Sequence, residues 1–274
     1  MIFDCFTLRD ELDLLELRLQ ILDNYIDKFV ISEANYTHKG DPKSYYFLEN
    51  QERFSRWANK IIYIPVDFEE DIKHIDFSII DPHTNIDKSR WSLENKQRLA
   101  LLYGIETGED NDMIIISDID EIPNLDALPT EISTPMSLIQ KFYYYYVNNE
   151  SIGPKDKLWA GSVVCLKHHL SNYTPQNLRD FRWQLPYIPN GGWHWSYLGG
   201  EDFIKAKLNS IVEAESILKD FNLNQSDILL NFKNLKDLYN REGMNFQLVD
   251  LCTYPEHILR IIKQYPKFIY YAKI

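Results

Sequence analysis

Between residues 113 and 123 the chain reads Met-Ile-Ile-Ile-Ser-Asp-Ile-Asp-Glu-Ile-Pro, an apolar run followed by acids. The run 113–116 has the length of one buried strand and is too short for a helix. Asp118, Asp120 and Glu121 follow it, and like charges a few Å apart repel unless a cation or hydrogen-bond donors neutralise them. Two interpretations stay open from this stretch alone: an Asp-x-Asp clamp for a metal-bound diphosphate, or an acidic turn before the next element.

The residues before this stretch predict a parallel α/β sheet. Apolar runs at 2–6 and 28–32 flank residues 12–22, whose leucines recur at helical spacing. Such a strand–helix–strand unit is typical of a parallel sheet, in which ligands bind at the carboxyl ends of the strands. The turn at 7–10 contains no glycine, so the sequence carries neither a Rossmann fingerprint nor a P-loop.

Beyond the acidic cluster the pattern changes. Residues 136–147 and 161–167 are β-rich, which favours a mixed or antiparallel second half of the sheet. Residues 185–197 are rich in glycine, proline and aromatic residues and cannot form a long helix. Residues 202–219 carry an apolar helical face, which predicts a helix packed on the rest of the domain.

Composition narrows the range of partners. The formal net charge of −12 argues against nucleic acid or an anionic membrane surface as the main partner. Aromatic residues make up 14% of the chain, and their flat faces favour a carbohydrate ligand. Cys5, Cys165 and Cys252 lie far apart, which fits reduced thiols in a cytosolic protein better than disulfides. No apolar run has the length of a membrane span and no signal peptide is recognisable, so we expect a soluble, cytoplasmic protein without an integral membrane segment.

A second candidate site lies in the stretch Gly191-Gly-Trp-His-Trp-Ser196. The two glycines allow close approach of the backbone, and His194 lies between two tryptophans. A single histidine in such a setting often has only a structural role. Imidazole and carboxylate together are also a suitable ligand set for Mn²⁺, so Asp120 and His194 could hold one metal ion, with diphosphate oxygens and water completing its coordination.

A set of short motifs occurs in a fixed order along the chain. They are Asp4-x-Phe6, Glu11-Leu-Asp-Leu-Leu-Glu16-x-Arg18, Phe29-Val-Ile-Ser-Glu33, Thr37-His-Lys-Gly40, Ile115-Ile-Ser-Asp-Ile-Asp-Glu-Ile-Pro123 and Gly192-Trp-His-x-Ser196. Over residues 2–215 this ordered set resembles glycosyltransferase family 17. The resemblance implies an α/β fold of the GT-A-like type, with a mixed, mostly parallel central sheet flanked by helices.

The same resemblance implies the reaction. It is the metal-dependent, inverting transfer of a sugar (N-acetylglucosamine in the animal enzyme) from a UDP-sugar donor to a hydroxyl group of a glycan or glycoconjugate, with Mn²⁺ or Mg²⁺. One catalytic domain is expected over 1–274, divided into a nucleotide-binding half (1–125), an acceptor-side β-rich half (126–200) and a helical C-terminal extension (201–274). Two other classes stay open: a non-catalytic carbohydrate-binding module, and a metal-dependent hydrolase acting on a nucleotide-sugar.

Carried onto this sequence, the site of the family falls at the ends of the predicted strands. Asp120 and His194 would hold the metal, with Asp118 shared between metal and ribose. Asp118, Asp120 and His194 are thus the expected metal site, and for each nucleotide-sugar contact named next the alternative is a surface or helix-pair role. The remaining nucleotide-sugar contacts are expected from Thr7, Arg9, Glu33, Asn95 and Arg98.

Inversion requires a carboxylate that takes the proton of the attacking hydroxyl. Asp202 and Glu201, which follow the Gly199-Gly200 pair, are the candidates, and Glu150 and Asp180 are rivals. The acidic pair at 201–202 could equally cap a helix, because negative charge stabilises a helix N-terminus.

Overall fold

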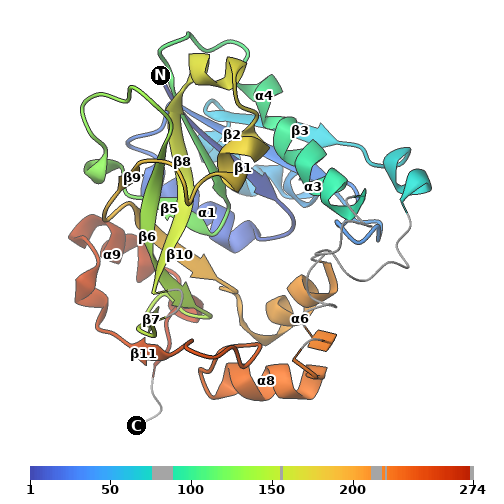
Figure 1. Cartoon of the computed structure of the whole chain (residues 1–274), viewed down its shortest axis with the longest axis vertical. Helices are drawn as coiled ribbons and strands as arrows, with labels where there is room; N and C mark the ends of the chain where they lie inside the picture. Colours follow the sequence, from blue (N-terminus) through green and yellow to red (C-terminus); the bar gives the residue numbers. More distant parts are fainter. Residues whose placement is uncertain (76–88, 155–156, 211–217, 220, 272–274) are drawn as a thin grey trace.

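One sheet runs through the centre of the molecule (Figure 1), for which a computed structural model describes residues 1–75, 89–154, 157–210, 218–219 and 221–271. Its strands are β1 (Ile2–Leu8), β2 (Lys28–Ala34), β3 (Ile61–Val66), β4 (Met113–Asp118), β5 (Glu121–Pro123), β6 (Met136–Tyr144), β7 (Asn149–Ser151), β8 (Leu158–Leu166), β9 (Tyr187–Ile188), β10 (Gly192–Ser196) and β11 (Phe246–Leu248). Their order is β11-β7-β6-β8-β4-β1-β2-β3, with β10 paired to β5 and β6, and β9 paired to β6.

Helices surround this sheet. The α-helices are α1 (Leu12–Leu22), α2 (Tyr46–Glu49), α3 (Ser89–Leu99), α4 (Leu101–Gly104), α5 (Pro175–Asp180), α6 (Gly200–Ser210), α8 (Gln225–Lys233) and α9 (Glu256–Ile262). Short 3-10 helices occupy Gln51–Trp57, Asp71–His74, Leu125–Ala127, Lys167–Ser171, Leu251–Thr253 and Pro266–Phe268. No helix in the described ranges is long and apolar enough to cross a membrane.

The first half of the sheet is parallel, as the sequence predicts. β1 pairs in parallel with β2 and with β4, and β2 pairs in parallel with β3. The register places Thr7 of β1 opposite both Ser32 of β2 and Asp118 of β4. The carboxyl ends of these strands are therefore aligned, and the acidic cluster lies at the same edge as the turn after β1.

The second half of the sheet is mixed. β8 is antiparallel to both β4 and β6, whereas β10 is parallel to β6 and antiparallel to β5. The strand β5 follows a bend at Ile119–Asp120, and its pairing with β10 places His194 opposite Glu121. The mixed α/β class expected from the sequence is thus confirmed, and the fold brings the second candidate site next to the first.

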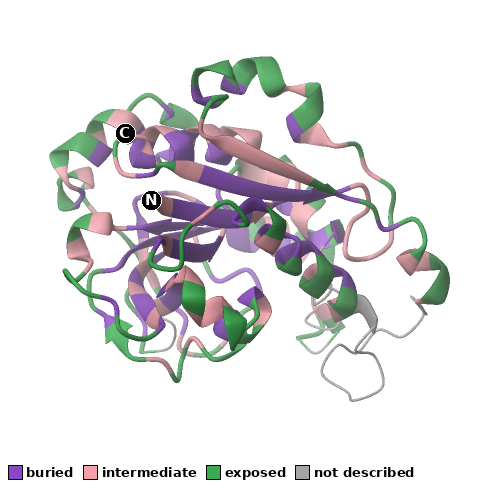
Figure 2. Cartoon of the chain, turned by 90° about the horizontal axis from the view of Figure 1, so that it is seen from above, coloured by how far each residue is buried: buried purple, intermediate pink, exposed green. Residues whose placement is uncertain are grey.

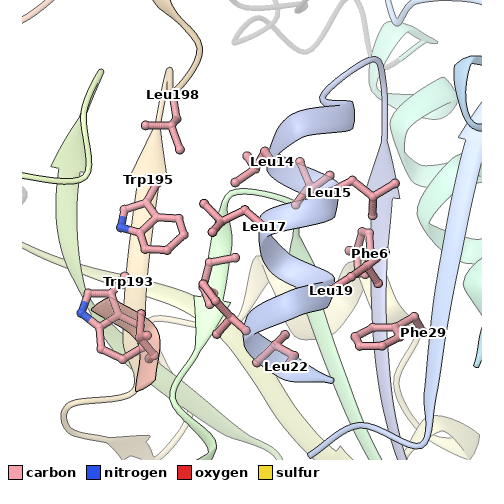
Figure 3. Packing of buried hydrophobic residues seen from close by; sticks show 14 of the residues in the cluster. Phe6, Leu14, Leu15, Leu17, Leu19, Leu22, Phe29, Trp193, Trp195 and Leu198 are labelled. Carbon is pink, nitrogen blue, oxygen red and sulfur yellow. The ribbon is translucent and has the colours of Figure 1, made fainter. Parts of the chain in front are cut away.

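Both faces of the parallel half are buried, because successive side chains of a strand point to opposite faces. Phe6 and Phe29 pack against the leucines of α1, which contact the indole rings of β10 on their other side (Figure 3). Cys5 and Val30 point the opposite way and pack with Leu101 of α4. Figure 2 shows most of the strands as a buried layer between partly exposed helices, whereas the edge strand β3 is partly exposed. Each fully buried leucine contributes about 1.5–3 kcal/mol of transfer free energy.

The C-terminal segment belongs to the core. Tyr254 and Ile258 of the α9 region pack into the same hydrophobic cluster as α1. Trp195 of β10 is fully buried, and its indole N–H donates to the Tyr254 hydroxyl at 3.0 Å. The Tyr254 hydroxyl in turn donates to the Val147 carbonyl at 2.6 Å, so the C-terminal segment is tied to the strand that carries His194.

Helices α6 and α8 form a second cluster with the tyrosines that end β6 (Figure 1). The helix predicted at 202–219 is observed as α6 over Gly200–Ser210. Residues 211–217 and 220 of that prediction lie outside the described residues. The C-terminal extension also contains the edge strand β11, which pairs antiparallel with β7, so it is not wholly helical.

Candidate active site

A cleft of about 400 Å³ lies at the carboxyl ends of β1, β2 and β4, with residues of β10 and α6 on its other side. Its walls carry more cationic than anionic side chains, although the net charge of the whole chain is −12. A cleft with several cationic side chains suits an anionic ligand such as a diphosphate. The lining residues with full charges are Arg9, Lys43, Arg98, Lys207 and Arg241, and Glu11, Glu94, Asp118 and Asp120.

Asp118 lies at the end of β4 between two buried arginines. Arg98 donates to Oδ1 at 2.8 Å, and Arg179 donates to Oδ2 at 2.7 Å. Burial alone would raise the pKa of Asp118, but the two guanidinium groups outweigh it and hold this pKa well below its usual range. Both oxygens are committed to cations, so the structure does not favour the predicted metal-ligand role for Asp118. Its partly exposed side chain can still accept a hydrogen bond from a sugar hydroxyl.

Glu121 is buried beneath the same turn. It accepts hydrogen bonds from the Arg179 guanidinium at 2.7 Å, from the Trp159 indole N–H at 2.7 Å and from the Asp118 backbone N–H at 2.9 Å. These donors explain how several carboxylates can lie so close together. Glu121 therefore stabilises the turn and does not line the cleft.

Asp120 and His194 are brought together in the cleft. The His194 Nε2 lies 3.6 Å from Asp120 Oδ1, and the Lys207 ammonium donates to Asp120 Oδ2 at 3.1 Å. The Trp195 N–H donates to the Asp120 carbonyl at 2.8 Å, so β10 fixes the spacing between the two side chains. Burial would raise the pKa of Asp120, but Lys207 and His194 outweigh it and hold this pKa well below the usual range.

The surroundings of His194 are aromatic and tightly packed. Its ring stacks on Phe142 with centroids 5.0 Å apart and lies 4.8 Å from the Trp159 ring. Among the described residues, no hydrogen-bond partner reaches its buried Nδ1. Gly192 has a φ of +130°, and a Cβ at this position would lie 2.0 Å from the Ile122 carbonyl oxygen. The close backbone approach predicted for the glycines is therefore observed.

The residues fit a divalent ion only together with a ligand. No group of three His, Cys, Asp or Glu side chains that could hold a metal occurs within the described ranges. The 3.6 Å between His194 Nε2 and Asp120 Oδ1 is too long for a good hydrogen bond but compatible with two ligands of one ion. Carboxylate and imidazole both bind Mn²⁺, and a diphosphate can supply further oxygen ligands, as Mg²⁺ sites in phosphate-binding enzymes do.

Two of the predicted nucleotide contacts line the cleft at the end of β1. Thr7 is the last residue of β1 that pairs with β4, where it lies opposite Asp118, and Arg9 follows in the turn. The Arg9 guanidinium donates to Asp10 at 2.7 Å and to the Ser210 hydroxyl, and it lies 5.1 Å from the Phe203 ring. Arg9 therefore connects the end of β1 to α6 across the cleft.

Glu33 does not line the cleft. It is fully buried and accepts hydrogen bonds from Lys43 at 3.0 Å, from the Tyr63 hydroxyl at 2.8 Å, and from the backbone N–H groups of Tyr46 and Phe47 at 2.7 and 3.1 Å. These four donors occupy both carboxylate oxygens. The prediction that Glu33 meets the nucleoside is corrected: this side chain fixes the loop after β2 to the start of α2.

Asn95 is exposed on α3 and is likewise absent from the cleft. The helix turns Gln97 and Arg98 toward the cleft, with Glu94 one turn before Arg98, because residues three and four apart share a face. Arg98 is thus the member of the predicted Asn95–Arg98 pair that reaches the acidic cluster.

The proposed base residues also lie outside the cleft. The Asp202 side chain is fully exposed, and Glu201 is ion-paired with Lys205 at 2.8 Å and with Lys233 at 3.7 Å. Both belong to the first turn of α6, where negative charge stabilises the helix. The structure therefore corrects the assignment of Asp202 and Glu201 as catalytic residues.

The two rival carboxylates do not line the cleft either. Glu150 accepts from the Tyr143 hydroxyl at 3.2 Å and from Lys141 at 3.4 Å. Asp180 is exposed at the end of α5 and accepts from Gln176 at 2.7 Å.

Sequence reasoning missed several side chains that build the site. Arg179 was not singled out, although the Thr174 and Asn177 capping box marks the start of its helix. Lys207 follows Ile204 by one helical turn beside Leu208, and this proximity to the buried face of α6 is the only local signal. Gln97 had no signal in the sequence, because its role depends on two strands that lie far from it along the chain.

Comparison of the sequence with known proteins identifies a family. Residues 1–252 match the family model described as glycosyltransferase family 17. No curated protein matches the chain significantly. Among solved structures, the chain is similar to the crystal structure of 2-C-methyl-D-erythritol 4-phosphate cytidylyltransferase from Francisella tularensis, with a TM-score of 0.36 and 10% identity over 76% of this chain and 99% of that one.

Proposed function

The chain belongs to glycosyltransferase family 17, and on this premise we propose that it transfers N-acetylglucosamine from a UDP-sugar to a glycan or glycoconjugate hydroxyl, with inversion. The transferase class and the need for a sugar donor and an acceptor follow from the family. The observation that carries the finer proposal is the Asp120–His194 pair with Lys207 behind it, in a cleft at the strand ends.

We propose that Asp120 and His194 hold Mn²⁺ or Mg²⁺ jointly with the donor diphosphate. When bound, the ion would neutralise the charge that develops on the leaving diphosphate. Lys207 adds a partly buried positive charge on the other side of Asp120, and the Asp120 carboxylate in turn raises the pKa of this ammonium against the effect of burial. Lys207 is therefore protonated throughout the physiological range and can bind a phosphate oxygen.

The nucleoside end of the donor is assigned to the ends of β1 and β2. Asp118 offers a partly exposed carboxylate to the ribose hydroxyls, and Arg98 and Arg179 fix its direction. The register places Thr7 between the strand of Ser32 and that of Asp118. Adjacent strands lie about 4.8 Å apart, so the span from β2 to β4 is about 10 Å, roughly the reach of a nucleoside from its base to its phosphate.

We propose that the acceptor binds on the aromatic side of the cleft. Trp159 lines the cleft beside His194, and Trp183 packs edge-on against it with ring centroids 6.1 Å apart. Trp183 is 58% exposed, which is unusual for so large an aromatic side chain. An exposed indole face next to a sugar-transfer site suits a pyranose ring that stacks on it.

A nucleotide-sugar panel tests this function. The chain is incubated with Mn²⁺ and each of UDP-N-acetylglucosamine, UDP-glucose, UDP-galactose and GDP-mannose, and released nucleoside diphosphate is measured with and without oligosaccharide acceptors. We expect release from UDP-N-acetylglucosamine that rises with an acceptor. In parallel, UDP with Mn²⁺ at 100 times its Kd should raise the free energy of unfolding by about 2.7 kcal/mol. No release from any donor and no stabilisation by any nucleoside diphosphate would overturn the proposal.

A further inference from the structure

Gln97 of α3 connects the ends of the two strands under the nucleoside end of the cleft. Its amide nitrogen donates to the Leu8 carbonyl at 3.1 Å and to the Ser32 carbonyl at 2.9 Å, and it is 3% exposed. Carbonyl oxygens only accept hydrogen bonds, so the group that faces them must be the NH₂ group. The orientation of the Gln97 amide is therefore fixed by the backbone of β1 and β2.

The same geometry fixes the tautomer of a histidine in the cleft. The Gln97 Oε1 lies 2.9 Å from the Nε2 of His38. Because the NH₂ group faces the two carbonyls, the atom that faces His38 is Oε1, which can only accept a hydrogen bond. The proton between Oε1 and the imidazole therefore belongs to Nε2. In a neutral imidazole the other nitrogen, Nδ1, then carries a lone pair and accepts a hydrogen bond.

Nδ1 is the nitrogen that is left for a ligand. His38 lines the cleft together with Leu8, Tyr36 and Thr37, at the β1–β2 end. Nε2 points to Gln97, and no side chain or backbone group in the described part of the chain bonds to Nδ1. The cleft thus presents a hydrogen-bond acceptor of fixed tautomer where the proposed donor would place its base.

We propose that His38 reads the nucleobase of the donor by accepting the imide N3–H of uracil through Nδ1, with Gln97 as its positioning residue. This inference rests on the function proposed above and names a determinant of its nucleotide specificity. Cytosine has an unprotonated N3 at the equivalent position, so its lone pair would face the lone pair of Nδ1. A site that leaves two acceptors opposed rejects the wrong ligand through the lost hydrogen bond and the unpaired polar group.

The test measures binding of UDP, CDP and N3-methyl-UDP by calorimetry in the presence of Mn²⁺. The methyl group removes the hydrogen while keeping the uracil carbonyls. For the unmodified chain we expect UDP to bind about tenfold more tightly than either of the other two, the scale of one hydrogen bond and its unsatisfied counterpart. His38→Ala should weaken UDP about tenfold and leave CDP and N3-methyl-UDP within about twofold, so that discrimination is lost.

His168→Ala is the matched control, because His168 is exposed and lies outside the cleft. It should keep the preference for UDP. The comparison of UDP with N3-methyl-UDP uses the unmodified chain and stays informative even if His38→Ala fails to fold. Equal binding of UDP and N3-methyl-UDP, or a preference that survives in His38→Ala, overturns the role of His38 and leaves the transferase proposal standing. Absence of binding by every nucleoside diphosphate overturns both.

Discussion

Arg18 and Asp4 form a two-bond ion pair without any exposed surface, with Nε donating to Oδ2 at 2.8 Å and Nη2 to Oδ1 at 2.6 Å. The Arg18 Nη1 also donates to the carbonyls of Asp118, Ile119 and Glu121, at 3.3, 3.2 and 2.7 Å. This pair of α1 and β1 therefore holds the backbone of the turn from which Asp118 and Asp120 project.

Arg18→Met should lower the free energy of unfolding by about 3–5 kcal/mol, because it leaves Asp4 buried without its cation. Three backbone carbonyls also lose their donor. Urea denaturation at pH 7 measures the change. Arg53→Met is the matched control. Arg53 pairs with Glu16 of α1, the helix that also carries Arg18, but both side chains of this pair are partly exposed. A surface pair contributes only about 0–1 kcal/mol, and equal losses in the two variants would contradict the assignment.

Asp120→Asn should abolish metal-dependent UDP binding and reduce transfer by about a hundredfold or more, since it removes the proposed metal ligand and the partner of Lys207. Because Asp120 and His194, the proposed ligands, are not joined by a third His, Cys, Asp or Glu side chain within the described residues, Mn²⁺ alone should stabilise the chain little, and Mn²⁺ with UDP much more. Thermal unfolding with each ligand and with both measures this. Lys205→Met, at a surface ion pair of α6, is the control and should behave as the unmodified chain. Normal transfer by Asp120→Asn would refute the site.

Trp183→Ala should raise the KM for an oligosaccharide acceptor about three- to tenfold, because an aromatic stacking contact contributes about 0.5–1.5 kcal/mol. Hydrolysis of the donor without acceptor should not change, since Trp183 lies beyond Trp159 and does not line the cleft. Tyr103→Ala, which removes a 68% exposed aromatic ring at α4, serves as the control. An unchanged KM for the acceptor would show that the acceptor binds elsewhere.

Thiol reactivity should distinguish the cysteines. Cys252 is exposed, whereas Cys5 and Cys165 are buried, and burial raises the pKa of Cys165 to about 12. A chromogenic disulfide at pH 8 should modify one thiol in the folded chain and all of them in denaturant. Because the pKa of Cys165 is higher in the folded than in the unfolded chain, its contribution to stability is complete below about pH 8.5 and is lost as the pH rises toward the folded value. Rapid modification of Cys165 in the folded chain would contradict this burial.

The parallel half of the sheet could be predicted from the sequence because its signals are local. The apolar runs at 2–6, 28–32 and 113–116 are the cores of β1, β2 and β4. Strand length and continuous hydrophobicity do not depend on the rest of the chain. The Asp120–His194 pair was predicted through the resemblance and through ligand chemistry, since the pairing of β5 with β10 has no local signal.

Apart from Arg98, the side chains that neutralise the acids could not be predicted, because their role depends on where distant elements pack. Arg179 and Lys207 reach Asp118 and Asp120 from α5 and α6, and neither differs in sequence from a surface cation. The prediction for Asp202 is wrong for a related reason, because a position shortly after His194 does not determine which way a side chain points. Helix α6 turns Ile204 and Leu208 inward, and the helical period then directs Asp202 to solvent.

The hydrogen bond between Trp195 and Tyr254 has a consequence for folding during synthesis of the chain. Domains generally begin to fold from the N-terminus while translation continues, so the β1–β4 half can assemble on the ribosome. The strand that carries His194 is also supported by Tyr254 and the α9 region, which are translated after it. Nascent chains stalled before Tyr254 should therefore possess the β1–β4 half of the sheet without finished packing around the strand of His194.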